Sequence, residues 1–87
     1  TSTIVGGTAS LIRVFVRGRA VAGDTTLNLP GATFTGQTIT VKDANGDAAA
    51  DNIIVVAPSI DGAASDTLTF DYQARNYTWN GVEWSRT

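Results

Sequence analysis

The chain has 87 residues and a net charge of −2, and 43% of its residues are hydrophobic while 16% are charged. It contains no cysteine and no histidine, which excludes disulfides, thiolate chemistry and histidine-ligated zinc, and its scattered basic residues form no stripe for binding nucleic acid. No apolar run approaches the roughly 18 residues typical of a membrane span, so we expect one small domain without membrane insertion, whose low charge favours a partner surface.

The first strand is expected at residues 11–17, after a small, polar segment at residues 1–10 that we interpret as an N-terminal arm. Apolar and polar residues alternate here, as in a strand with one face against a core. The predicted core face carries Ile12, Val14 and Val16. The opposite face carries Arg13, Phe15 and Arg17. We interpret it first as a face exposed to solvent, and the alternative is that it contacts a partner.

Two further strands are expected on either side of a turn at Pro30-Gly31. Residues 25–29 place Leu27 and Leu29 inward, and residues 37–42 alternate in the same way. The inward residues of this second strand are Ile39 and Val41.

The next turn, Asp43-Ala-Asn-Gly-Asp47, is predicted to be a type I′ hairpin turn, because Asn45-Gly46 can supply two positive φ angles. Its oxygen ligands are also spaced like the first half of a calcium loop. However, the glycine is misplaced, and Ile54 stands where such a loop needs an acidic ligand. We therefore interpret Asp43 and Asp47 as turn caps and expect no metal or cofactor, while a weak calcium site stays open.

Residues 48–50 are interpreted as a loop, and the strand expected at residues 52–57 is apolar on both faces. Such a strand is either central in the fold or packed on another subunit. We expect its outer face and the N-terminal arm to contact other subunits. The interface candidates on this strand are Ile54, Val55 and Val56.

Aromatic residues dominate the C-terminal part of the chain. After a turn at residues 60–62, a strand over residues 67–72 would align Leu68, Phe70 and Tyr72. A two-residue loop at Asn80-Gly81 would then pair Trp79 with Val82 and Tyr77 with Trp84. This register gathers Tyr77, Trp79 and Trp84 on one face, either as core or subunit interface or, together with Tyr72, as a platform for sugar rings.

These elements predict an all-β fold in which residues 11–87 form a single domain, a small antiparallel β-sandwich or jelly-roll-like barrel of about seven or eight short strands. No enzyme is expected, because catalysis would have to use carboxylates that lie mostly in turns, where they commonly cap backbone N–H groups. The predicted core comprises Ile12, Val14, Val16, Leu27, Leu29, Ile39, Val41, Leu68 and Phe70.

The order of several motifs between residues 37 and 86 resembles a domain that recurs in tailed-phage virion proteins. The motifs are Ile39-Thr-Val-Lys-Asp-Ala-Asn-Gly-Asp47, Asn52-Ile-Ile-Val-Val56, Ile60-Asp-Gly62 and Tyr77-x-Trp-Asn-Gly-x-x-Trp84. This chain has Asp47 where the family commonly has asparagine. The resemblance implies a β-structured, non-enzymatic domain, commonly a homotrimer, located on the capsid surface or on a tail appendage of the virion.

Two virion roles follow from this resemblance, and a third function remains beside them. A capsid cement or decoration protein would bind the major capsid protein and stabilise the shell. A knob at the tip of a tail fibre or tail needle would contact the host surface, but it normally follows a stalk that residues 1–36 do not show, so we favour the cement role. The third function is a carbohydrate-binding module that recognises a glycan, such as one on the host surface.

Overall fold

The computed structural model describes residues 2–17, 23–31 and 33–87, and every regular element within these ranges is a β-strand. The expected all-β class is therefore confirmed. In chain order the strands are β1 (Ser2–Thr3), β2 (Leu11–Val16), β3 (Thr25–Asn28), β4 (Thr38–Asp43), β5 (Ile53–Ile60), β6 (Ala63–Leu68), β7 (Ala74–Trp79) and β8 (Trp84–Arg86).

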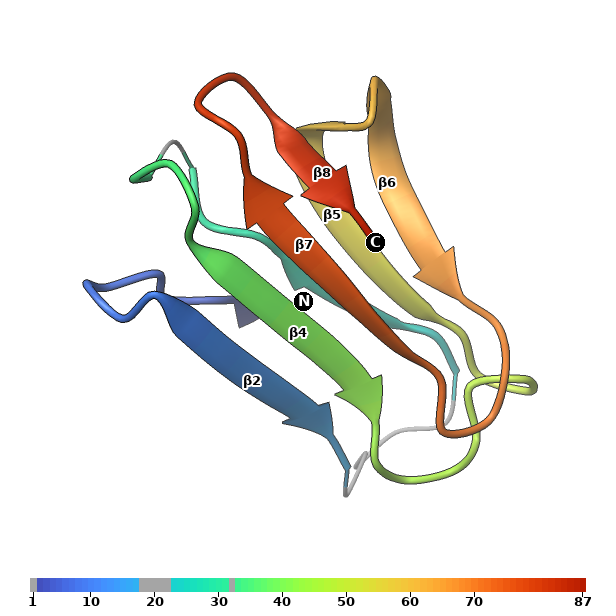
Figure 1. Ribbon diagram of the computed structural model, residues 1–87. Coiled ribbons are helices and arrows are strands. Elements are labelled where there is room, and N and C mark those ends of the chain that lie inside the picture. The colour runs from blue at the N-terminus through green and yellow to red at the C-terminus, as the bar shows by residue number, and fades with distance from the viewer. Residues whose placement is uncertain (1, 18–22, 32) are drawn as a thin grey trace.

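The strands form one strongly curled sheet whose two halves enclose the core, as in a half-barrel (Figure 1). One half contains β2, β4 and β7, and the other contains β1, β3, β5 and β6. β8 joins the halves, because it pairs with β7 over its whole length and with β5 at the pair Ile60 and Trp84.

The pairing is mixed, which corrects the expected antiparallel arrangement. β2 runs parallel to β4 and β3 runs parallel to β5, whereas β4 pairs with β7 and β5 with β6 in antiparallel fashion. The cause lies in the connections: from β2 to β5 the chain alternates between the two halves of the sheet. Strands two apart in sequence therefore become neighbours that point the same way.

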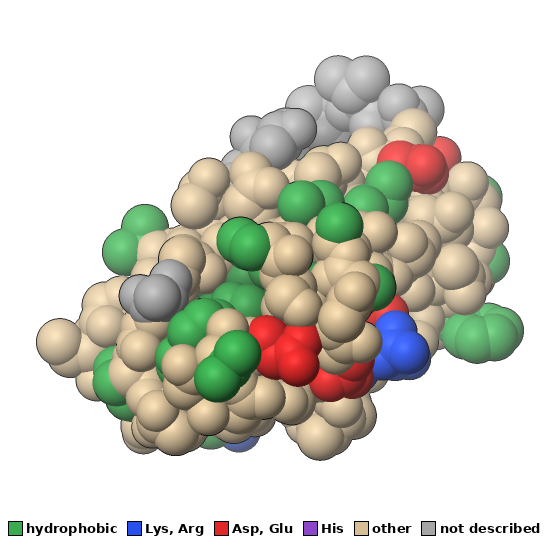
Figure 2. All heavy atoms as spheres, turned by 90° about the horizontal axis from the view of Figure 1, so that it is seen from above, with side chains coloured by type: hydrophobic (Ala, Val, Ile, Leu, Met, Phe, Trp, Pro, Cys, Tyr) green, Lys and Arg blue, Asp and Glu red, His purple; other side chains and the backbone are tan. Residues whose placement is uncertain are grey.

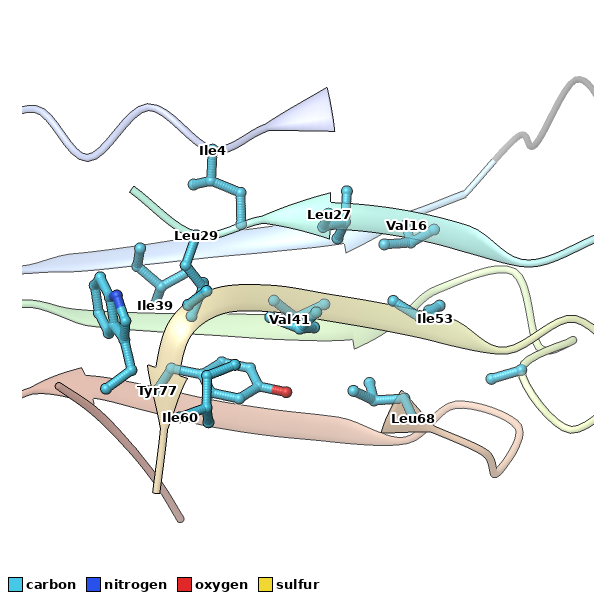
Figure 3. Close-up of a cluster of buried hydrophobic side chains, with 14 residues drawn as sticks. Ile4, Val16, Leu27, Leu29, Ile39, Val41, Ile53, Ile60, Leu68 and Tyr77 are labelled. Carbon is cyan, nitrogen blue, oxygen red and sulfur yellow. The ribbon is translucent and has the colours of Figure 1, made fainter. Parts of the chain in front are cut away.

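The hydrophobic core lies between the two halves of the sheet, and Figure 3 shows its side chains. Six of the predicted core residues are buried, namely Val16, Leu27, Leu29, Ile39, Val41 and Leu68. Ile12 and Val14 are partly buried against the same cluster. The core also contains Ile4, Ala48, Ile53, Val55, Ala57, Ile60, Tyr77 and Trp84.

Phe70 was wrongly expected in the core, and its side chain is 70% exposed. β6 ends at Leu68, so the alternation of the strand does not reach Phe70. The side chain of Gln73 folds this segment into a turn, because its Oε1 atom accepts the backbone N–H groups of Thr69 and Phe70 at 2.8 Å and 3.2 Å. The turn directs Phe70 outward.

The N-terminal segment is part of the sheet and does not extend as a separate arm. Ser2 and Thr3 pair in parallel with β3, and the side chain of Ile4 is buried in the core. The loop that follows is held by the buried Gln37 amide, whose Nε2 atom donates to the carbonyl oxygens of Gly6 and Ala9 at 2.6 Å and 3.0 Å.

Neither Asn-Gly pair forms the expected two-residue hairpin loop. β4, which precedes Asn45-Gly46, does not pair with the next strand along the chain, β5. Asn80 begins a longer loop, in which its Oδ1 atom accepts the N–H groups of Val82 and Glu83, so Trp79 pairs with Trp84 and not with Val82. The tight hairpin lies between β5 and β6 instead, where Asp61 and Gly62 have φ angles of 50° and 83°.

Candidate functional site

The three interface candidates on β5 separate into two environments. Val55 is completely buried in the core, so its expected place on an outer face was wrong. Ile54 and Val56 point to the outer face and are half-buried there. The alternation of a strand explains this difference, because β5 lies between β3 and β6 and only every second side chain faces the core.

The candidates on β2 lie on the exposed outer face of the sheet. Arg13 and Phe15 are both exposed, as is Arg17 directly after the strand, and Leu11 shares the outer face with them. β2 pairs only with β4 among the described strands, so it forms one edge of the sheet. An exposed edge strand with apolar outer residues is a typical site for association with another chain.

Three exposed aromatic residues belong to the segments at one end of the sheet, the lower end in Figure 1, where β2 and β4 end and β6 turns into β7. Phe15 stands opposite Lys42 in the register of β2 and β4, and the Lys42 Nζ atom lies 5.8 Å from the centre of the Tyr72 ring. Phe15 is 57% exposed and Tyr72 is 61% exposed. We call Phe15, Lys42, Phe70 and Tyr72 the basal surface.

The buried carboxylate of Asp43 holds the loops beneath the basal surface. Its Oδ1 atom accepts the backbone N–H groups of Asn45 and Gly46, both at 3.0 Å. Its Oδ2 atom accepts those of Asp47 and Ala48 at 2.9 Å and that of Tyr72 at 3.0 Å. One side chain thus joins the loop after β4 to the turn before β7.

These hydrogen bonds also determine the charge state of Asp43. Burial acts to raise the pKa of this carboxyl group, but the backbone N–H groups led by that of Tyr72 outweigh it and lower the pKa to about 2. The group is therefore ionised at neutral pH. Because both of its oxygens point at N–H donors, Asp43 is not oriented as a calcium ligand.

Close packing at Gly46 fixes the position of Tyr72. Gly46 has a φ angle of 78°, and a Cβ atom added there would come within 2.5 Å of the Tyr72 ring. Tyr72 itself has a φ angle of 61°, a conformation that only the surrounding contacts make acceptable for a tyrosine. The basal surface therefore depends on the loop around Asp43.

The aromatic cluster of Tyr77, Trp79 and Trp84 forms on one face, as expected, although through a different register. The rings of Trp79 and Trp84 meet edge to face with centres 5.6 Å apart. Tyr77 and Trp84 are buried, and only Trp79 is half-exposed. The cluster therefore belongs to the core, and it does not present the flat row of rings that a sugar platform needs.

Below this cluster, a charged group joins the two halves of the sheet. Asp66 on β6 accepts a hydrogen bond from the Tyr77 hydroxyl at 2.8 Å, and its carboxylate also lies 2.7 Å from Arg86 and 3.4 Å from Arg75. Burial raises the pKa of Tyr77, and the hydrogen bond to Asp66 acts in the same direction. Tyr77 thus acts here as a neutral hydrogen-bond donor.

A small pocket opens at the other end of the molecule. Figure 2 shows that end from above, with hydrophobic side chains next to acidic ones. It was not predicted from the sequence, because its walls come from three separate stretches of the chain, namely residues 30–31, residues 58–59 within β5, and residues 79–84. The only features of the sequence that could have indicated it are the two prolines, Pro30 and Pro58, and the residues after Asn80-Gly81. We call it the apical pocket, lined chiefly by Pro30, Pro58, Trp79, Val82, Glu83 and Trp84.

No cluster of three or more acidic side chains suited to a metal ion occurs in the part of the chain that the structure describes. Within the same residues there is also no helix long and apolar enough to cross a membrane. Comparison with known proteins gave no assignment: neither a protein-family model nor a curated protein matches this chain.

Proposed function

We propose that this chain is a non-enzymatic structural domain of a tailed-phage virion, which attaches as an oligomer, by expectation a homotrimer, to the coat lattice and stabilises the shell. The observation that carries the proposal is the basal surface. Its three aromatic side chains, Phe15, Phe70 and Tyr72, are each more than half exposed. Together these residues expose on the order of 400 Å², which is within the range of the largest apolar patches on small proteins, and such patches are often functional.

The basal surface is also suited to a repeated contact. One cation, Lys42, lies beside Phe15 in the register of β2 and β4, and its Nζ atom donates to the Tyr72 carbonyl oxygen at 2.7 Å and faces the Tyr72 ring. The surrounding loops are held by the buried Asp43, so these side chains project from a rigid support. A rigid aromatic patch loses little entropy on binding, as an anchor between neighbouring subunits requires.

Three carboxylates have partners that favour a structural role over a catalytic one. Asp43 binds backbone N–H groups, Asp66 binds two arginines and a tyrosine, and Glu83 accepts hydrogen bonds from Ser59 and Gly62. Each of these groups stabilises a loop or joins two strands. The alternative role as a tip domain of a fibre or needle is favoured by a separate feature, the apical pocket, which opens at the end opposite the basal surface.

The first test is the number of copies of this chain in each purified virus particle, measured by quantitative mass spectrometry against the major coat protein. Hundreds of copies in a simple ratio to coat protein would support the cement role. A handful would favour a tail tip, and absence from the particle would refute both roles.

The second test addresses the basal surface directly. We expect the double variant Phe15→Ser, Phe70→Ser to lose self-association in light scattering and to lose co-sedimentation with particles. Both side chains are exposed, so the variant should keep its fold. Phe34→Ser, which removes an exposed aromatic ring in the loop before β4, is the matched control and should change neither property. Unchanged association of the double variant would refute the basal surface as the interface.

A further inference from the structure

The apical pocket has apolar walls and one acidic group. The rings of Pro30, Pro58 and Trp79 line it together with the side chain of Val82, and Glu83 is the charged member of the lining. The pocket lies where β3 ends, where β5 passes Pro58 and where β7 leads into β8. It is separate from the basal surface, so neither proposal depends on the other.

The Glu83 carboxylate is fixed in place by two hydrogen bonds to the same oxygen atom. Its Oε1 atom accepts the Ser59 hydroxyl at 2.6 Å and the Gly62 N–H at 2.8 Å. These bonds leave the Oε2 atom without a partner among the described residues. Both hydrogen bonds lower the pKa of Glu83, the bond from Ser59 more than the bond from Gly62. The Glu83 carboxylate is therefore negatively charged at neutral pH.

No cation in the described part of the chain neutralises Glu83. Arg86 is the closest arginine in sequence, but its guanidinium group binds Asp61 at 3.5 Å and Asp66 at 2.7 Å. A fixed negative charge beside an indole ring favours a positively charged ligand, because both the carboxylate and the π face attract a cation.

The size of the pocket restricts the ligand further. Its volume is about 60 Å³, which accommodates about four to six water-sized atoms. A lysine side chain beyond its Cα atom has about that many non-hydrogen atoms, whereas a hexose has about twice as many. A sugar would also need several hydrogen-bond partners, whereas the Ser59 hydroxyl already donates to Glu83.

We propose that the apical pocket binds a single basic side chain, lysine or arginine, from a partner protein. The alkyl part of this side chain packs between Trp79 and the two prolines, and its charged end meets the free oxygen of Glu83. The shared chemistry is that of a long side chain with an apolar stem and a cationic end.

The test is an NMR titration of the whole chain, uniformly labelled with ¹⁵N, using capped single amino acids as probes. Nα-acetyl-lysine amide and Nα-acetyl-arginine amide carry the proposed group, and Nα-acetyl-norleucine amide has nearly the same stem without the charge. Methyl glucoside tests a sugar. We expect the two basic probes to shift the Trp79 indole N–H and the Glu83 amide signals, with dissociation constants in the millimolar range that increase with salt.

The matched variant is Glu83→Gln, whose Oε1 atom can still accept the hydrogen bonds from Ser59 and Gly62. It should weaken the binding of both basic probes by about fivefold. Asp71→Asn is the control: it alters an exposed acid in the turn before β7, at the other end of the molecule in Figure 1, and should leave binding unchanged.

Three outcomes would overturn the proposal. Norleucine binding as tightly as lysine would show that charge is not recognised, and tighter binding of the glucoside would show a sugar site. Absence of any shift at these signals up to about 50 mM probe would show that the pocket binds no basic side chain. A dispersed amide spectrum of Glu83→Gln would establish that the variant is folded.

Discussion

Replacement of Asp43 by asparagine should strongly destabilise the fold, because this one buried carboxylate accepts five backbone N–H groups. An asparagine has one acceptor oxygen and one NH₂ group. Even in its better orientation, the NH₂ group would face the donors of Asn45 and Gly46 and leave both unsatisfied. A buried N–H group that loses its partner costs about 1–3 kcal/mol, and these two N–H groups are partly buried. We therefore expect Asp43→Asn to lower the free energy of unfolding by about 2–3 kcal/mol at pH 7.

The lowered pKa of Asp43 follows from the same hydrogen bonds. It is lowered from 3.8 to about 2 in the folded protein, which corresponds to about 2.5 kcal/mol of stabilisation by the ionised form. Because the folded-state pKa is the lower one, this contribution is present above pH 4 and is lost as the pH falls from about 4 to about 2. The difference between wild type and Asp43→Asn should decrease over the same interval.

Urea unfolding followed by tryptophan fluorescence, at several pH values between 7 and 2, measures both effects. Asp24→Asn is the control, because the exposed Asp24 carboxylate accepts the single N–H group of Asn52 at 2.9 Å, and it should cost less than about 1 kcal/mol. A loss for Asp43→Asn no larger than that of the control would contradict this account. So would a difference from wild type that stays constant down to pH 2.

Three further predictions concern the core and its turns. Tyr77→Phe should lower the free energy of unfolding by about 1–2 kcal/mol in urea unfolding, because Asp66 loses a buried hydrogen-bond donor; no loss would show that the arginines alone satisfy this carboxylate. Val55→Asp should unfold the chain, as circular dichroism would report, whereas Ile54→Asp on the outer face should retain the strand signal; equal effects would contradict the assigned faces. Gly46→Ala should cost about 1 kcal/mol or more in thermal unfolding, because alanine is strained at the Gly46 φ angle of 78° and its methyl group must displace the Tyr72 ring; an unchanged melting temperature would contradict this.

The alternation of apolar residues predicted the inward faces of most strands, because that pattern is local and follows directly from the geometry of an extended chain. For β2, β3 and β4 the expected inward residues are buried or partly buried, as Val16, Leu27 and Ile39 illustrate. Strand partners were not predictable in the same way. Two-residue hairpins were expected at both Asn-Gly pairs. In the structure β2 pairs with β4 and β3 pairs with β5, both in parallel, so strands that are not consecutive in sequence determine the pairing.

The candidate site was less predictable for a related reason. In the sequence Phe70 continues the alternation of Leu68, but β6 ends at Leu68, and the hydrogen bonds of Gln73 and Asp43 hold residues 69–72 in a turn with Phe70 and Tyr72 exposed. The role of Asp43 as a turn cap was expected, whereas its hydrogen bond to Tyr72, which is distant in sequence, was not. The apical pocket combines residues 30–31, residues 58–59 of β5 and residues 79–84, which are distant from one another in sequence, so no local pattern marks it.

The bridging position of β8 has a consequence for how the molecule folds. The two halves of the sheet are joined through a strand of three residues, Trp84–Arg86, and the Trp84 ring is itself part of the core. Apart from β8, no described strand of the half with β4 pairs through its backbone with a strand of the half with β5. The two halves of the sheet can therefore join only after residues 84–86 have been synthesised. We expect the chain to fold in one cooperative step at that point, and neither half of the sheet to be stable alone.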